Sequence, residues 1–387
     1  MSAFGMPQAL PRSLVIEPVW TDRWDYGLLA SALFLAGLGL VMVASASVSI
    51  ADKALSQPLY YFWRQAANLG FALALGAVTL CVATPVWRRL GPVLLVLGIV
   101  LLAVLLLPGV GREVNGSTRW MNFGALNLQP SEVMRLFLVI YLAGYLVRRT
   151  EEVRSRLGGF LKPVVLLSLI AALLLLEPDY GATVVMFATA LGMMFLAGVP
   201  LTIFLVWVLV TVSFFACLVL AAPYRLERLL IFMNPWSDPY GSGFQLTQAL
   251  IAIGRGEWFG VGLGASVQKL FYLPEAHTDF LFAVLAEELG LVGMLSVISL
   301  FAFIVIRAMQ IGARAEKLGN PFCAYLAYGV GLLIALQSLI NIGVNMGVLP
   351  TKGLTLPLMS YGGSSLVVSC VCVALLLRID HELRTGA

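Results

Sequence analysis

A single aspartate, Asp279, stands at the mouth of a long apolar segment, in the stretch L-P-E-A-H-T-D-F at 273–280. The chain is 60% hydrophobic and only 11% charged, so an acid in this position is unusual. An ionised side chain costs roughly 2.5–3.5 kcal/mol at the centre of a bilayer, and acids at that depth are usually paired, hydrated or functional. Asp279 or Thr278 could also cap the helix that follows. Both roles are compatible, because a capping acid at a helix mouth still has oxygens that face water.

Further acids flank Asp279 on both sides. Glu275 and His277 come just before it and could orient it or touch a polar ligand. Glu287 and Glu288 follow two turns further in and, at 100° per residue, do not share its helix face. We interpret at least one of these two acids as structural, bonded to another span.

Two clusters could supply cations. G-S-T-R-W at 116–120 places Arg119 beside Trp120, a pair that also serves as an interfacial anchor. L-Q-P-S-E-V-M-R at 128–135 contains Glu132 and Arg135, whose spacing suits an i, i+3 ion pair that holds helices in register. Either cluster could instead contribute to a polar site.

A third cluster interrupts apolar sequence at 348–365, in V-L-P-T-K-G-L-T-L-P-L-M-S-Y-G-G-S-S. Irregular backbone at membrane depth is tolerated only inside protein or against water. Lys352 could meet an anion there, although a snorkelling lysine is the ordinary alternative. By contrast, G-V-G-L-G at 260–264 lacks the strand and helix context of a nucleotide-binding fingerprint.

An acid near several cations suits a transferase that acts on a lipid-linked pyrophosphate. The carboxylate takes a proton from an acceptor hydroxyl, and the cations stabilise the leaving phosphates. No multi-carboxylate ligand set is visible, and a divalent cation (Mg²⁺ or Mn²⁺) on the pyrophosphate is left open. Five scattered cysteines and a net charge of +4 indicate neither a disulfide framework nor a nucleic-acid partner.

Long apolar runs must position these residues, and they predict an all-α polytopic membrane protein with about ten spans. A long extracytoplasmic loop, 222–277, separates the seventh span from the eighth. The predicted organisation is an N-terminal tail (1–25), a transmembrane domain (26–378) and a C-terminal tail (379–387). The ten spans are expected near 26–48, 64–84, 90–109, 131–147, 162–177, 180–198, 200–221, 278–306, 321–347 and 357–378.

Orientation follows from the distribution of lysine and arginine among the short loops. Fourteen lie on one side and five on the other, which places both termini in the cytoplasm. The long loop then faces outward.

These motifs, in this order, resemble the SEDS family (shape, elongation, division and sporulation) over nearly the whole chain. The shared blocks include Q-P-S-E at 129–132, P-D-Y-G at 178–181, N-P-W-S-D-P-Y-G-S-G-F-Q-L-T-Q at 234–248 and those containing Asp279 and Lys352. The G-R-G-E-W-F-G stretch and the 25-residue lead are more similar to family members of the division septum than to those of side-wall growth.

The resemblance implies an inner-membrane glycosyltransferase that polymerises lipid II into peptidoglycan, together with an FtsI-like class B penicillin-binding protein. Asp279 matches the family's essential aspartate, the general base. Glu177 departs from the family, in which many members have glutamine, and Arg135 stands where many have lysine. Substrate binding is expected from Arg119, Trp120, Glu132, Arg135, Glu275, His277, Thr278, Lys352 and Ser360.

Two other functions remain open at this point. A lipid II flippase would also carry intramembrane acids, but it should line a path through the bilayer with polar groups. A scaffold that only recruits the transpeptidase would tolerate Asp279→Asn.

Overall fold

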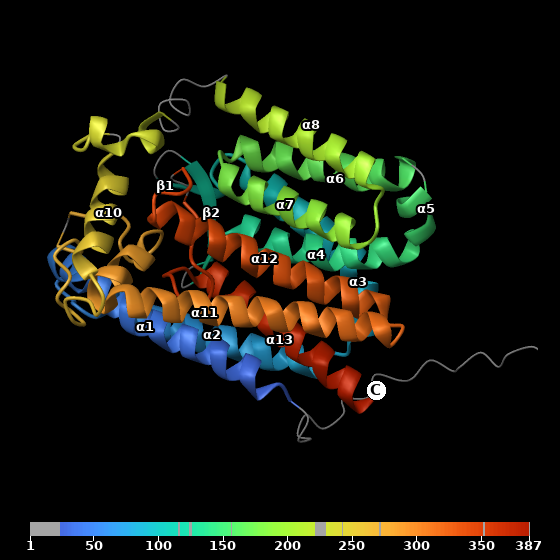
Figure 1. The fold of residues 1–387 in the computed structure, drawn as a ribbon, viewed down its shortest axis with the longest axis horizontal. Helices are drawn as coiled ribbons and strands as arrows, with labels where there is room; N and C mark the ends of the chain where they lie inside the picture. Colours follow the sequence, from blue (N-terminus) through green and yellow to red (C-terminus); the bar gives the residue numbers. More distant parts are fainter. Residues whose placement is uncertain are drawn as a thin grey trace, which may run out of the picture.

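The computed structural model describes residues 24–386 except 115–116, 124–125, 156, 221–229, 242, 271 and 351–352. Ten long helices of this described part run side by side (Figure 1), and they match the ten expected spans. They are α1 (Tyr26–Leu55), α2 (Tyr60–Cys81), α3 (Thr84–Leu105), α4 (Pro130–Arg148), α6 (Leu157–Leu176), α7 (Tyr180–Leu196), α8 (Leu201–Leu220), α11 (Leu281–Lys317), α12 (Pro321–Asn345) and α13 (Gly363–Thr385). Eight of them are long and apolar enough to cross a membrane, and α7 is a shorter apolar helix.

Shorter elements gather mainly at one end of the bundle, which we call the loop-rich end. There α10 (Phe244–Gly256) runs across the ends of the long helices, next to the 3-10 turn η1 (Pro235–Ser237) (Figure 1). The all-α expectation missed an antiparallel sheet of β1 (Gly111–Val114), β2 (Ser117–Phe123) and β3 (Leu126–Leu128), in the order β1-β2-β3. Helix α5 (Thr150–Ser155) lies at the opposite end.

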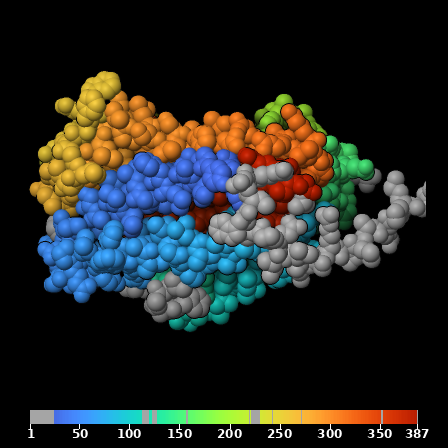
Figure 2. Space-filling model, turned by 90° about the horizontal axis from the view of Figure 1, so that it is seen from below, coloured from blue at the N-terminus to red at the C-terminus, as the bar shows by residue number. Residues whose placement is uncertain are grey.

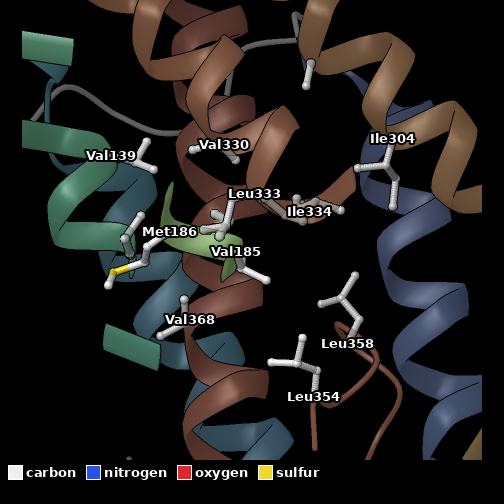
Figure 3. Packing of buried hydrophobic residues seen from close by; sticks show 14 of the residues in the cluster. Val139, Val185, Met186, Ile304, Val330, Leu333, Ile334, Leu354, Leu358 and Val368 are labelled. Atoms are coloured by element: carbon white, nitrogen blue, oxygen red, sulfur yellow. The ribbon is translucent and has the colours of Figure 1, made fainter. Parts of the chain in front are cut away.

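The centre of the bundle is formed by α4, α7, α12 and α13. Val185 of α7 and Leu333 of α12 are buried there with Val368 of α13 (Figure 3). The irregular segment between α12 and α13 adds Leu354 and Leu358 to the same core. By contrast, α8 lies at the edge, and α1 and α2 cover one face together (Figure 2). The residues before α13 are therefore fixed by a packed core although they are not helical.

At the end opposite the sheet, α13 continues through residues that the sequence assigned to a tail. Its buried carboxylate Asp380 pairs with Arg314 of α11 at 2.7 Å. Arg307 of α11 pairs with Asp25, which also caps α1. Residues 379–385 are thus part of the bundle, whereas residues 1–23 of the predicted N-terminal tail lie outside the described residues.

Helix α11 is interrupted at Gly290, where φ is 65° and ψ is −163°. The segment after α10 enters the break and completes its hydrogen bonds. Val261 N donates to Glu287 O at 3.0 Å, and Leu291 N donates to Glu257 O at 2.9 Å. This backbone pairing, which we call the clamp (residues 256–262 against 286–292), gives the glycines of G-V-G-L-G a structural role. It also makes residues 281–289 a separate short helix that follows Asp279.

The sequence predicted that at least one of the two acids before the break is structural and bonded to another span, and Glu288 confirms this. Glu288 accepts hydrogen bonds from Ser45 of α1 and from the buried Lys269, whose Nζ lies 2.9 Å away. Glu287 accepts from Ser266 and Arg255. Both carboxylates are fully buried, so these bonds replace the water that each lost.

We expect Lys269→Met to destabilise the protein by about 3 kcal/mol, the lower end of the range for removing one partner of a buried ion pair. The Glu288 carboxylate would keep Ser45 as a donor but lose its counter-charge. Thermal unfolding in detergent measures this effect. The exposed Lys317→Met is the matched control, and equal midpoints for both variants would contradict the assignment.

Candidate active site

Asp279 lies in the turn before α11, and its side chain is half-buried. The prediction that Thr278 or Asp279 caps α11 is wrong. The residue at the cap position is Phe280, and neither Thr278 nor Asp279 accepts a hydrogen bond from the backbone amides in the first turn of α11. Instead, Asn345 of α12 accepts from Ala283 N at 3.0 Å. Within the described part of the chain, no hydrogen bond engages the Asp279 carboxylate, which therefore remains available for chemistry.

The backbone of this turn is fixed by α12. Asn341 and Asn345 each donate to the carbonyl of Asp279 at 2.9 Å. Asn341 also donates to Leu354 O, and Gln337 donates to Thr355 O at 3.2 Å. The three amides form a buried stripe spaced four residues apart, on one face of an apolar helix. This stripe holds the Asp279 turn against the segment that precedes α13.

That segment passes directly over Asp279. A Cβ atom built on Gly353 would lie 3.1 Å from Asp279 Oδ2, so glycine keeps this approach open. The predicted ligand Lys352 precedes Gly353 and lies outside the described residues. Ser360, further along, is buried, and its hydroxyl accepts from Leu356 N at 2.9 Å. Its position favours a role in shaping this segment.

Arg119 reaches the site from β2. Its guanidinium donates to the carbonyls of Glu177 and Pro178, in the turn between α6 and α7. Burial raises the pKa of both Asp279 and Glu177, and the positive charge of Arg119 opposes that rise. Trp120 follows it on β2 and is half-buried. The structure thus brings together Arg119 and Asp279, which are 160 residues apart in the sequence.

Burial raises the pKa of Asp279 to about 7, and the negative charges of Glu275 and Asp179 act in the same direction. Arg119 opposes them. A carboxyl group with such a pKa is partly ionised at neutral pH and can accept a proton in a reaction, as a general base does. The ordinary pKa of aspartate would make it a weaker base.

Glu275, His277 and Thr278 form the turn itself. The Thr278 hydroxyl donates to Glu275 Oε2 at 2.8 Å. The imidazole of His277 lies between Tyr61 and Tyr361, with ring centroids 4.8 and 5.5 Å away. Burial lowers the pKa of His277, which favours its neutral form. These contacts join the turn to α2 and to the segment before α13.

Glu132 and Arg135 lie deeper, at the start of α4. They form the expected ion pair at 3.2 Å, and both side chains are buried. Ser131 donates to Asp179 Oδ2 at 2.9 Å, and Asp179 also caps α7 by accepting from Ala182 N. The placement of Glu132 and Arg135 favours a supporting role over direct contact with a substrate.

The sequence interpretation did not include Asp179, Asn341 or Asn345 in the site. A signal for the two asparagines was present, because polar residues at i and i+4 in an apolar helix mark a buried polar face. For a metal, the described residues offer no group of three or more His, Cys, Asp or Glu side chains able to hold one ion. We therefore derive no step through a metal.

Comparisons with known proteins relate this chain to one family. The profile of a family of cell cycle proteins that includes FtsW, RodA and SpoVE matches residues 26–385. A probable peptidoglycan glycosyltransferase FtsW of Nitrosococcus halophilus is 58% identical over 94% of both chains. The protein of the same description from Pseudomonas fluorescens is 56% identical over 95% of this chain and 91% of its own.

Two solved structures are also similar. One belongs to a peptidoglycan synthase complex that coordinates polymerization and crosslinking, with a TM-score of 0.73, 28% identity, and coverage of 94% of this chain and 99% of that chain. The other is the rod shape determining protein RodA of Thermus thermophilus, with a TM-score of 0.67, 27% identity and the same coverage. The fold and the order of the elements are therefore shared over almost the full length.

Proposed function

The chain belongs to the family of FtsW, RodA and SpoVE and is a peptidoglycan glycosyltransferase, and we propose that it polymerises lipid II with Asp279 as the general base. The observation that carries this assignment is the half-buried carboxylate of Asp279, which makes no hydrogen bond within the described residues and on which the positive charge of Arg119 acts. The relatives indicate that the reaction is glycosyl transfer, and the geometry of the site indicates which residue accepts the proton.

In the proposed step, the 4-hydroxyl oxygen of an acceptor GlcNAc attacks the anomeric carbon of a donor MurNAc. The bond between that carbon and the pyrophosphate oxygen breaks, and the configuration inverts from α to β. The hydroxyl proton passes to the Asp279 carboxylate, and undecaprenyl pyrophosphate leaves with its negative charge. General base help of this kind contributes about 10²–10⁴ in rate.

Arg119 supplies fixed positive charge for the leaving pyrophosphate. Its anchoring to two backbone carbonyls supports this role, because a preorganised donor needs no rearrangement in the transition state. We include Lys352 as a second source of positive charge because it directly precedes Gly353 in the sequence. Mg²⁺ or Mn²⁺ enters the proposal only as a counter-ion carried by the substrate's pyrophosphate.

We place the protein in the bacterial inner membrane at the division septum, with both termini in the cytoplasm. The FtsW descriptions of its relatives support the septum, and the excess of basic residues in one set of short loops supports the orientation. The loop-rich end with Asp279 then faces outward, where lipid II is consumed.

A class B penicillin-binding protein is the proposed partner, which crosslinks the new strands. The similar synthase complex supports such a pairing. Apolar side chains on the outer faces of α11 and α12, among them Leu295, Ile306 and Leu339, are more than half exposed and could receive a partner's single span.

The proposal is tested with purified protein and labelled lipid II, with and without the partner, and products are separated on a gel. We expect glycan polymer from the complex. Absence of polymer even with the partner, together with transfer of lipid II across proteoliposome membranes, would favour the flippase instead.

A further inference from the structure

Glu177 is a buried acid to which the reaction described above gives no role. It lies in the turn between α6 and α7, and 1% of its surface is exposed. Within the described structure its Oε1 atom has no hydrogen-bond partner. Its neighbour Asp179 is fully engaged, because it caps α7 and accepts from Ser131 and Gln129. The Glu177 carboxyl group is therefore not needed to hold this turn together.

The backbone of the same turn holds Arg119. The carbonyls of Glu177 and Pro178 accept from its guanidinium, so the cation is held by the backbone of the residue that carries the buried carboxyl group. The charged groups that act on Glu177 are Arg119 from β2 and Asp179 from its own turn. Asp279, from the turn before α11, responds to the same two charges. The charge of Arg119 thus acts on both carboxyl groups.

Burial raises the pKa of Glu177 to about 8, and Asp179 acts in the same direction while Arg119 opposes it. At neutral pH the carboxyl group is therefore mostly protonated and uncharged. An uncharged Glu177 leaves the full positive charge of Arg119 for other partners, whereas an ionised Glu177 would compete for that charge.

We propose that Glu177 is a positioning residue that acts through Arg119: its neutral form leaves the charge of the guanidinium to the substrate's pyrophosphate, and its ionised form competes for that charge. This inference rests on the proposed function, since it assigns Arg119 to the leaving group. It predicts that polymerisation declines on the alkaline side because Glu177 loses its proton.

The test compares wild type with Glu177→Gln, in complex with the partner, by measuring kcat/KM for lipid II from about pH 6.5 to 9.5. Glutamine has the same shape as the protonated acid and cannot ionise. We expect the variant to keep the neutral rate within about twofold and to lose the wild-type alkaline decline near pH 8. The exposed Glu151→Gln, at the opposite end of the bundle, should retain that decline.

An alkaline decline that is unchanged in Glu177→Gln would overturn the inference. So would a folded Glu177→Gln protein whose rate is lost at every pH, because a neutral side chain would then not suffice. The proposed function fails separately, if wild type forms no polymer or if Asp279→Asn still forms it. Thermal unfolding of each variant shows whether the protein is folded.

Discussion

Replacing Asp279 with asparagine is expected to reduce lipid II polymerisation by about 10²–10⁴-fold, the typical contribution of general base catalysis. Asparagine has nearly the same shape but cannot take up the acceptor's proton. The fold should be unaffected, because α12 holds this residue through its backbone carbonyl and not through its carboxylate. The rate of polymer formation with the partner present measures the effect.

The matched control is Asp52→Asn, an exposed acid near the end of α1. It removes the same charge and should leave the rate within about twofold, as expected for a surface substitution. If Asp279→Asn unfolds at the wild-type temperature and still polymerises lipid II at the wild-type rate, Asp279 is not the base.

Gly290→Ala is expected to destabilise the protein by about 3 kcal/mol or more. The φ and ψ angles of Gly290 lie in a region that is nearly exclusive to glycine, and strain there costs about 1–3 kcal/mol. An added Cβ would also lie 2.4 Å from Gly260 N, inside the clamp. The substitution must therefore open the backbone pairing that completes the break in α11.

The matched control for this substitution is Gly37→Ala in α1, where an added Cβ meets no atom within 4 Å. Alanine there should be neutral or slightly stabilising, since it favours the helix. Thermal unfolding in detergent compares the two variants. A Gly290→Ala protein as stable as Gly37→Ala would show that the clamp contributes little to the fold.

The ten long helices were predictable from the sequence because a chain in a membrane must satisfy its backbone polar groups within apolar helices. The sheet at 111–128 was missed because its strands are short and their pairing depends on turns. The break in α11 was missed for a different reason. Gly290 appears as an ordinary glycine in an apolar helix, and only the three-dimensional contact with Gly260 reveals why it must be glycine.

The site was predictable in part. The position of Asp279 at a helix mouth identified it as a site residue. The sequence could not show that Asp279 does not cap α11, because the side chain that accepts the first-turn amide belongs to Asn345, 66 residues later. The sequence also paired Glu132 with Arg135 correctly but could not give their depth. The link from Arg119 to Glu177 joins distant segments and appears only in the folded chain.

The central claim, that Asp279 is the general base, is tested most directly by the acid side of the pH profile. Wild-type kcat/KM should fall below about pH 7, because protonated Asp279 cannot accept a proton. Glu275→Gln removes a negative charge that raises the pKa of Asp279, so the decline should move to lower pH. A wild-type rate that stays constant down to about pH 5.5, or a decline that Glu275→Gln leaves in place, would contradict the account.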